Sequence, residues 1–289
     1  MLSYSIKRKS RAKLAHIREI YLASDPRVPS RNLSALIRCV EGRIDSLPSA
    51  SIRELVDTTV EPHVRGFLHT PDTASGHSLV LTHGAGGNAQ APLLRATADT
   101  FASAGFTVLR CNLPYRQARS FGPPGPADAS RDRAGLKNAI AALENVVKER
   151  TGAPLLAEVA RSGKSDRGPN QMFLGGHSYG GRQSSMLCSE QPELVSGLLL
   201  LSYPLHPPRR PEQQRTQHLP DLRTPTLFVH GTRDPFGSIE ELQRAMKMIP
   251  AQTKLLKVEG AGHDLGFRGK AKQEGLPSQI IAEFTNFLS

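Results

Sequence analysis

Short apolar runs alternate with helix-length segments along most of the chain. Six runs have the length of buried strands: Ser78–Thr82, Thr107–Arg110, Met172–Leu174, Leu198–Leu201, Thr226–Val229 and Lys254–Val258. The segments between and after them show helical patterns: Ala91–Ala104, Asp132–Arg150, Tyr179–Glu190, Ile239–Met248 and Ser278–Leu288. Repeated strand–helix units need right-handed crossovers. We therefore predict an α/β fold, with a mostly parallel sheet that carries helices on both faces.

Two further strands precede these units. Ser51–Val60 and Val64–His69 have the pattern of an antiparallel pair at one edge of the sheet. Three segments rich in Pro, Gly and Arg lie next to predicted strands: Leu113–Asp128, Arg161–Pro169 and Tyr203–Pro220. We interpret them as loops or lids rather than as linkers between domains.

Composition restricts the class of protein. The chain has 289 residues, of which 38% are hydrophobic and 22% charged, and this is globular composition. No run approaches the roughly 18 apolar residues of a membrane-spanning helix, so we expect none. Three cysteines (Cys39, Cys111 and Cys188) are an odd number and lie far apart. This argues against a disulfide framework and favours a reducing compartment, so we expect a cytoplasmic protein.

The positive charge is concentrated at the start of the chain. The formal net charge is +11, and residues 1–50 hold ten Lys and Arg against four Asp and Glu, leaving only +5 for the other 239 residues. We therefore predict a basic N-terminal extension over residues 1–50, poorly ordered or with short helices, and one domain over 51–289. In the extension, Leu14, Ile17, Ile20 and Tyr21 have the spacing of an amphipathic helix.

Several roles remain open for this basic extension. A tether to nucleic acid or an anionic membrane and a transit-like segment are functional interpretations, but charge runs usually mark solvated tails. Nucleic acid is not an expected partner of the domain itself. Its sequence has no Trp, and the whole chain has only five Tyr for base stacking.

A candidate nucleophile lies between a predicted strand and a predicted helix. Gly176–Gly180 reads Gly-His-Ser-Tyr-Gly and matches the G-x-S-x-G pattern of a nucleophile elbow, in which a serine occupies a sharp turn. A Cβ atom two positions before or after this serine would collide with neighbouring chain, which explains the two glycines. We predict that Ser178 is the nucleophile. The alternative is a glycine-rich turn with an incidental serine.

A serine hydroxyl needs a general base, which is itself oriented by a third group. Asp234 follows the strand Thr226–Val229, and His263 follows the last strand, so the chain order is Ser, Asp, His. Both lie at carboxyl ends of strands, where open parallel sheets place their sites. We predict His263 as the base and Asp234 as the acid.

Other histidines and acids are weaker candidates. His230 lies at a strand end before a glycine and has the position of a packed or capping residue, whereas His206 could line the pocket. Asp264 adjoins His263 in sequence and would point away from it. The remaining histidines are scattered without metal-ligand spacing, so we expect no metal site.

A glycine-rich loop follows the strand Ser78–Thr82. Two backbone N–H groups must face the developing oxyanion. We predict those of Tyr179 and Ala85, with Gly84 as the alternative to Ala85. A rival hypothesis is that residues 84–89 form a G-x-G-x-x-A dinucleotide fingerprint. No acid follows at the expected spacing, although Arg110 would suit a 2′-phosphate.

The assembled motifs resemble a known family, the α/β hydrolases related to dienelactone hydrolase. The branch it is most similar to contains the testis-expressed α/β-hydrolase-like protein and the hydrolase-like domain of the third subunit of the NSL chromatin complex. Four segments carry this resemblance: Leu81–Gly87, Gly175–Arg182, Ser202–Pro208 and Phe228–Gly237. It covers about residues 51–289. One departure is His177, where the branch commonly has Arg or Lys.

The resemblance implies a single α/β-hydrolase domain with a Ser178–Asp234–His263 triad and no cofactor. We expect a serine hydrolase that acts on a carboxylic ester or similar small acyl substrate. Residues 113–128 and 203–220 would frame the acyl pocket. These two segments contain four arginines, which indicate an anionic substrate or are simply solvated loop residues: Arg116, Arg119, Arg209 and Arg210. The alternative function is a non-catalytic binding or scaffold protein with the same fold. The sequence does not indicate the oligomeric state.

Overall fold

A computed structural model describes residues 50–151, 170–267 and 275–288 of the chain. Almost all of the predicted basic extension, with its amphipathic helix, and the predicted loop Arg161–Pro169 lie outside these residues. The part described begins just before the predicted antiparallel strands and contains every predicted site residue.

The centre of the domain is an eight-stranded sheet. Its strands are β1 (Ser51–Asp57), β2 (Val64–Thr70), β3 (Ser78–Thr82), β4 (Thr107–Cys111), β5 (Met172–His177), β6 (Gly197–Leu201), β7 (Thr226–Gly231) and β8 (Thr253–Val258). Their order in the sheet is β1-β2-β4-β3-β5-β6-β7-β8. The pairs β1–β2 and β2–β4 are antiparallel, and the other five pairs are parallel. The predictions of a mostly parallel sheet and an antiparallel edge pair are therefore confirmed.

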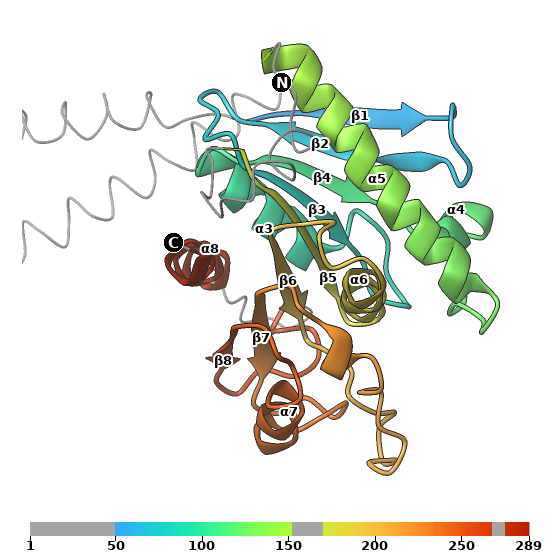
Figure 1. Cartoon of the computed structure of the whole chain (residues 1–289), viewed down its shortest axis with the longest axis vertical. Helices are drawn as coiled ribbons and strands as arrows, with labels where there is room; N and C mark the ends of the chain where they lie inside the picture. The colour runs from blue at the N-terminus through green and yellow to red at the C-terminus, as the bar shows by residue number, and fades with distance from the viewer. Residues whose placement is uncertain (1–49, 152–169, 268–274, 289) are drawn as a thin grey trace, which may run out of the picture. The chain divides into compact units, whose positions relative to one another are not determined.

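Helices cover both faces of this sheet (Figure 1). They are α3 (Pro92–Ser103), α4 (Pro114–Ala118), α5 (Asp128–Thr151), α6 (Tyr179–Glu190), α7 (Ile239–Met246) and α8 (Leu276–Leu288), with a 3₁₀ turn, η2, at Leu219–Asp221. One core cluster packs α5, α6 and α7 against the sheet, and a second packs α3 and α8 against it. The architecture is a single α/β domain with an eight-stranded, mostly parallel sheet.

The central strands are continuous apolar runs because both of their faces are covered. In β3, Leu79 and Leu81 join the cluster of α3 and α8, whereas Val80 between them joins the cluster of α5 and α6. All five residues of β3 and all five of β6 are buried. A strand buried on both faces loses the polar–apolar alternation of a half-exposed strand.

Element ends differ from the predictions where side chains cap the turns. Strand β1 stops at Asp57, three residues before the predicted end, because its carboxylate accepts the N–H and O–H of Thr59 at 2.9 and 2.6 Å. Helix α5 begins one turn earlier than predicted, at Asp128, whose carboxylate accepts the N–H of Gly125 at 2.7 Å. Helix α4 lies in a segment that we interpreted as loop, and Pro114 suits its first turn.

Two cysteines, Cys111 and Cys188, are free and buried. Burial raises the pKa of each thiol to about 12, so neither is a reactive thiolate at neutral pH. Among the residues that the structure describes, no helix combines the length and the apolar character needed to cross a membrane.

Candidate active site

Ser178 occupies a strained turn between β5 and α6. Its backbone has φ 52° and ψ −117°, a positive φ that non-glycine residues rarely adopt. The turn is held from both sides, because the Ser178 N–H donates to the Leu201 carbonyl at 2.8 Å and its own carbonyl accepts the Arg182 N–H at 2.9 Å. Residues of the flanking strand and helix therefore fix the position of the hydroxyl.

The glycines beside this turn allow the strand and the helix to approach each other. A Cβ atom on Gly176 would lie 2.7 Å from backbone atoms of Gly180 and Gly181. A Cβ atom on Gly180 would lie 2.5 Å from the His83 carbonyl oxygen. Both distances are shorter than real Cβ contacts, so the collisions that we inferred from the sequence motif occur here.

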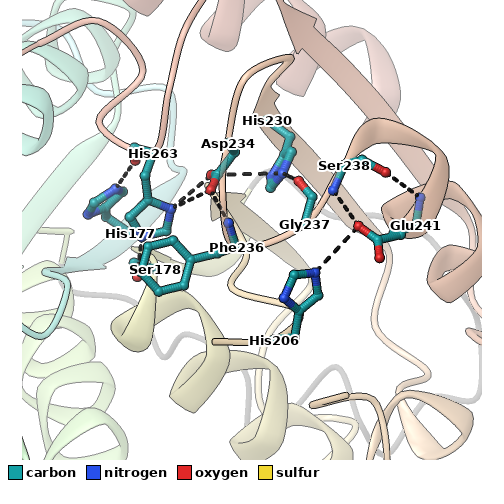
Figure 2. A network of polar contacts seen from close by, with 10 residues as sticks. All are labelled: His177, Ser178, His206, His230, Asp234, Phe236, Gly237, Ser238, Glu241 and His263. Atoms are coloured by element: carbon teal, nitrogen blue, oxygen red, sulfur yellow. Dashed lines mark hydrogen bonds and ion pairs between the residues drawn. The ribbon is translucent and has the colours of Figure 1, made fainter. Parts of the chain in front are cut away.

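The three residues predicted as nucleophile, base and acid meet in one row (Figure 2). His263 Nε2 lies 2.7 Å from Ser178 Oγ, and His263 Nδ1 lies 3.0 and 2.8 Å from the two carboxylate oxygens of Asp234. They follow the carboxyl ends of β5, β7 and β8, which meet at one edge of the sheet. Because carboxylate oxygens only accept, Nδ1 carries a proton and Nε2 is free to accept the serine proton.

The weaker candidates lie outside this row. His230 is buried, and its Nε2 donates to the Gly237 carbonyl at 2.8 Å. Burial lowers its pKa, so it is a neutral, packed residue beside Asp234. His206 faces Glu241, with 3.4 Å between Nε2 and Oε2, and is not among the cavity residues. Asp264 accepts the N–H of Gly266 at 3.1 Å.

Two residues that we did not predict contact His263, one at its ring and one at its backbone. Phe236 packs its ring against that of His263, with 4.1 Å between centroids and 31° between planes. His177 Nε2 donates to the His263 carbonyl at 2.8 Å (Figure 2). The only signal in the sequence was the position of each residue, beside Ser178 or two residues after Asp234.

The loop after β3 lies against the nucleophile. A Cβ atom on Gly84 would lie 3.2 Å from the Ser178 Cβ and 2.9 Å from His177 Nδ1. The Gly84 carbonyl accepts from His83 Nδ1 at 2.9 Å and from the Gly87 N–H at 3.0 Å. His83 Nε2 accepts the Leu113 N–H at 3.1 Å, which places the His83 proton on Nδ1. Burial lowers the His83 pKa to about 4, which agrees with a neutral ring.

Side chains of α4 hold the next carbonyls of this loop. Tyr115 Oη and the Arg116 guanidinium both donate to the Ala85 carbonyl at 2.9 Å, and Arg116 Nε donates to the Gly87 carbonyl at 2.9 Å. In a trans peptide the C=O and the following N–H point in opposite directions. Because the Gly84 carbonyl is held by His83, the Ala85 N–H points away from His83.

The row of polar residues opens into a cavity of about 750 Å³. The cavity is lined by the loop after β3, the start of α6 and parts of both segments that we expected to frame a pocket, namely Pro123–Pro126, Pro204 and Arg215. None of the four arginines named from the sequence lines it. Arg116 and Arg119 are occupied by loop carbonyls and Asp128, and Arg209 and Arg210 are exposed. Those arginines therefore give no support to an anionic substrate.

The rival dinucleotide hypothesis rested on the glycine spacing of residues 84–89, with Arg110 as a partner for a 2′-phosphate. This side chain is buried, and it donates from Nε to His69 Nε2 at 2.7 Å and from its terminal nitrogen to the Ala89 carbonyl. It is therefore occupied inside the domain. The glycine-rich loop faces Ser178, as an oxyanion loop would.

Comparisons with known proteins agree with this architecture. A family described as "Alpha/beta hydrolase domain" matches residues 75–288, about three quarters of the chain. Among solved structures, a dienelactone hydrolase from Anabaena variabilis is similar, with a TM-score of 0.60, 19% identity and coverage of 83% of this chain and 100% of that one.

Two other structures have the same fold. An α/β serine hydrolase homologue from Coxiella burnetii has a TM-score of 0.58 and 15% identity and covers 80% of this chain and 96% of its own. A serine hydrolase described as lacking a lid, from Xanthomonas campestris, has a TM-score of 0.53 and 14% identity and covers 82% and 95%. Likeness at such identities shows the fold alone.

Proposed function

Because the chain belongs to the α/β hydrolase domain family, we propose that it is a serine hydrolase that cleaves a carboxylic ester or similar small acyl compound. The observation that carries this proposal is the hydrogen-bonded row of Ser178, His263 and Asp234 beside an open cavity. Each contact lies between 2.7 and 3.0 Å, within the reach required for proton transfer.

The row gives each residue one role. Ser178 Oγ attacks the ester carbonyl while His263 Nε2 takes its proton. Asp234 accepts the Nδ1 proton and stabilises the imidazolium that forms. His263 then returns the proton to the leaving alcohol, which leaves an acyl group on Ser178. Water deprotonated by His263 attacks this acyl-enzyme, releases the acid and restores the serine.

The oxyanion of both tetrahedral intermediates needs donors. We assign the backbone N–H groups of Tyr179 and Ala85. Tyr179 is the first residue of α6, where N–H groups have no partner within the helix. Ala85 lines the cavity. The Gly84 carbonyl, which precedes its nitrogen, accepts from His83, and its own carbonyl accepts from Tyr115 and Arg116. Such fixed donors need no reorganisation during the reaction.

A serine-directed probe tests the nucleophile. We expect a fluorophosphonate to label the protein and short-chain nitrophenyl esters to be hydrolysed, and Ser178→Ala to remove both while the far-UV circular dichroism stays native. Ser202→Ala is the matched control, because Ser202 is also buried at positive φ (51°) and its hydroxyl has no partner within the described residues.

Two outcomes would contradict this proposal. A Ser178→Ala protein that keeps its rate would show that another residue is the nucleophile. An unmodified protein that is neither labelled nor active on any ester would favour the alternative function, a binding or scaffold protein.

Two finer expectations stay predictions. The resemblance to the branch with the testis-expressed protein and the NSL subunit is supported by the four sequence motifs, and the cytoplasmic location by the free cysteines.

A further inference from the structure

Helix α6 presents polar side chains to the cavity one turn beyond the nucleophile. Ser178, Tyr179, Arg182 and Gln183 all line the cavity. Their spacing of one, four and five residues from the serine places them on one face of a helix. With a rise of about 1.5 Å per residue, Arg182 lies about 6 Å along the helix from Ser178. A ligand group that contacts this position would be several bonds from the reacting carbonyl.

Two donors on this face are buried without acceptors. Within the part of the chain that the structure describes, neither Arg182 Nε nor Gln183 Nε2 has a hydrogen-bond partner. Gln183 is completely buried, and its other amide atom, Oε1, accepts from the Arg133 guanidinium at 3.1 Å. That contact fixes which end of the amide carries the donor. Buried donors without acceptors are rare because their lost hydration is not compensated, so these two require an explanation.

A second guanidinium reaches the same cavity from another element. Arg215 belongs to the segment between β6 and β7, and its backbone is fixed there: its N–H donates to the Leu205 carbonyl at 2.7 Å, and its carbonyl accepts from Tyr203 Oη at 2.8 Å. Burial lowers the pKa of Arg215, and the positive charge of Arg182 lowers it further. Both guanidiniums line this one cavity, and the charge of Arg182 acts on Arg215.

Negative charge is scarce at this end of the cavity. Asp264, which follows His263 in the chain, is the one acid among the described residues that line the cavity. No ion pair of Arg182 or Arg215 occurs within residues 50–151, 170–267 and 275–288. In the part of the chain that the structure describes, Arg182 and Arg215 are half-buried cations without a carboxylate partner, and Gln183 has a buried amide donor without an acceptor. An anion in the cavity would supply the missing acceptor.

We propose that Arg182, Gln183 and Arg215 bind a carboxylate carried by the substrate, so that the enzyme prefers esters with a second, negatively charged carboxyl group. This inference rests on the proposed hydrolase function. Guanidinium and amide N–H groups donate in a plane, and a planar carboxylate accepts in that geometry. The mostly apolar remainder of the cavity suits the hydrocarbon chain between the two carbonyl carbons.

A matched pair of esters measures this preference. Mono-4-nitrophenyl adipate carries a free carboxylate on the acyl side, and 4-nitrophenyl adipamate replaces it with an uncharged amide of the same shape. We expect the unmodified enzyme to have a higher kcat/KM for the acid. In Arg182→Gln or Arg215→Gln, the kcat/KM for the acid divided by the kcat/KM for the amide should fall about tenfold, as expected when a charged hydrogen bond is lost. The control is Arg210→Gln, an exposed loop arginine, which should keep the ratio.

A second pair places the carboxylate on the alcohol side: 3-carboxyphenyl butyrate and 3-carbamoylphenyl butyrate. If only this pair responds to the arginine variants, the carboxylate belongs to the leaving group. If neither pair responds to the arginine variants while all four esters are hydrolysed, the proposed carboxylate site is wrong.

A binding measurement separates this inference from the proposed function. Ser178→Ala should bind monomethyl adipate in calorimetry, with an affinity that falls as salt is added, and the double variant with Arg215→Gln should bind it about tenfold more weakly. Arginine-dependent binding without any esterase activity would support the carboxylate site and contradict the proposed hydrolase function. Esterase activity without arginine-dependent binding would support the hydrolase function and contradict the carboxylate site.

Discussion

At the scale of single residues, the site depends on side chains that hold other groups in place. Tyr115 is the clearest case. Its hydroxyl donates to the Ala85 carbonyl, and its ring packs edge-on against that of Tyr179, with 5.8 Å between centroids. Both residues assigned to the oxyanion are thus in contact with one buried tyrosine. A defect here should act on the transition state more than on substrate binding.

Replacement of Tyr115 by Phe tests this arrangement. Arg116 still holds the Ala85 carbonyl in the variant, so we expect kcat for a neutral nitrophenyl ester to fall by roughly three- to tenfold with KM almost unchanged. Steady-state kinetics measure both. An unchanged kcat would mean that the peptide between Gly84 and Ala85 keeps its orientation without Tyr115, or that the oxyanion is stabilised elsewhere.

The residue scale also shows what a sequence motif can and cannot predict. Ser178, Asp234 and His263 could be named because each follows an apolar strand and their order is informative. Arg182 and Arg215 could not be connected, because they are 33 positions apart in the chain and only the sheet order brings their segments to one cavity. Whether an arginine is occupied by a loop carbonyl is likewise a matter of tertiary contact.

At the scale of elements, the strand–turn–helix unit of β5 and α6 is the most constrained part of the fold. Gly175, Gly176, Gly180 and Gly181 all pack so closely that a Cβ atom would meet a neighbouring backbone atom at 2.7 Å or less. The apolar pattern predicted both elements, and their close approach followed from the motif. Helix α4 was missed because five residues that begin with Pro carry too little periodicity to be distinguished from a loop.

Gly176→Ala tests that close approach. The added methyl must displace backbone of α6, so we expect the free energy of unfolding to fall by about 2–4 kcal/mol and activity to fall as Ser178 moves. Urea unfolding monitored by circular dichroism gives the first quantity. The matched control is Gly275→Ala, where the new methyl would meet nothing within 4 Å. Equal stability of the two variants would contradict this account.

At the scale of the whole molecule, the buried His83 and the half-buried His218 connect stability to pH. Burial lowers the pKa of His83 to about 4, and burial with the charges of Arg182 and Arg133 lowers the pKa of His218 to about 4 as well. In the unfolded chain both return to about 6.5. Between these values the unfolded chain binds more protons than the folded protein, so stability is fully present above pH 6.5 and is lost as the pH falls.

We therefore expect the free energy of unfolding to decrease steadily from pH 6.5 to pH 5. In the variant His218→Gln the slope of this free energy against pH should decrease by up to about 1.4 kcal/mol per pH unit, because one titrating group has been removed. Urea unfolding at a series of pH values measures the slope. His63→Gln, at a side chain about one-third exposed, is the control. An identical slope in all three proteins would show that His218 titrates alike in the folded and unfolded states.

The fold could be predicted almost completely because its central strands are buried on both faces and its helices lie between strands in regular order along the chain. The substrate could not, because the cavity is made by loops whose contacts are set only after the sheet has formed.

The strained serine turn, the acid, the base and the oxyanion loop follow β5, β7, β8 and β3, respectively, so the chemistry proposed here occupies one rim of the sheet. The backbone hydrogen bonds between neighbouring strands fix the register of the sheet, and the register fixes the position of that rim. The molecule is therefore modular for the purpose of redesign. We expect that exchange of Pro123–Pro126 or of the segment with Arg215, which line the cavity, would change which substrates the proposed hydrolase accepts without altering the hydrogen-bonded row or the sheet.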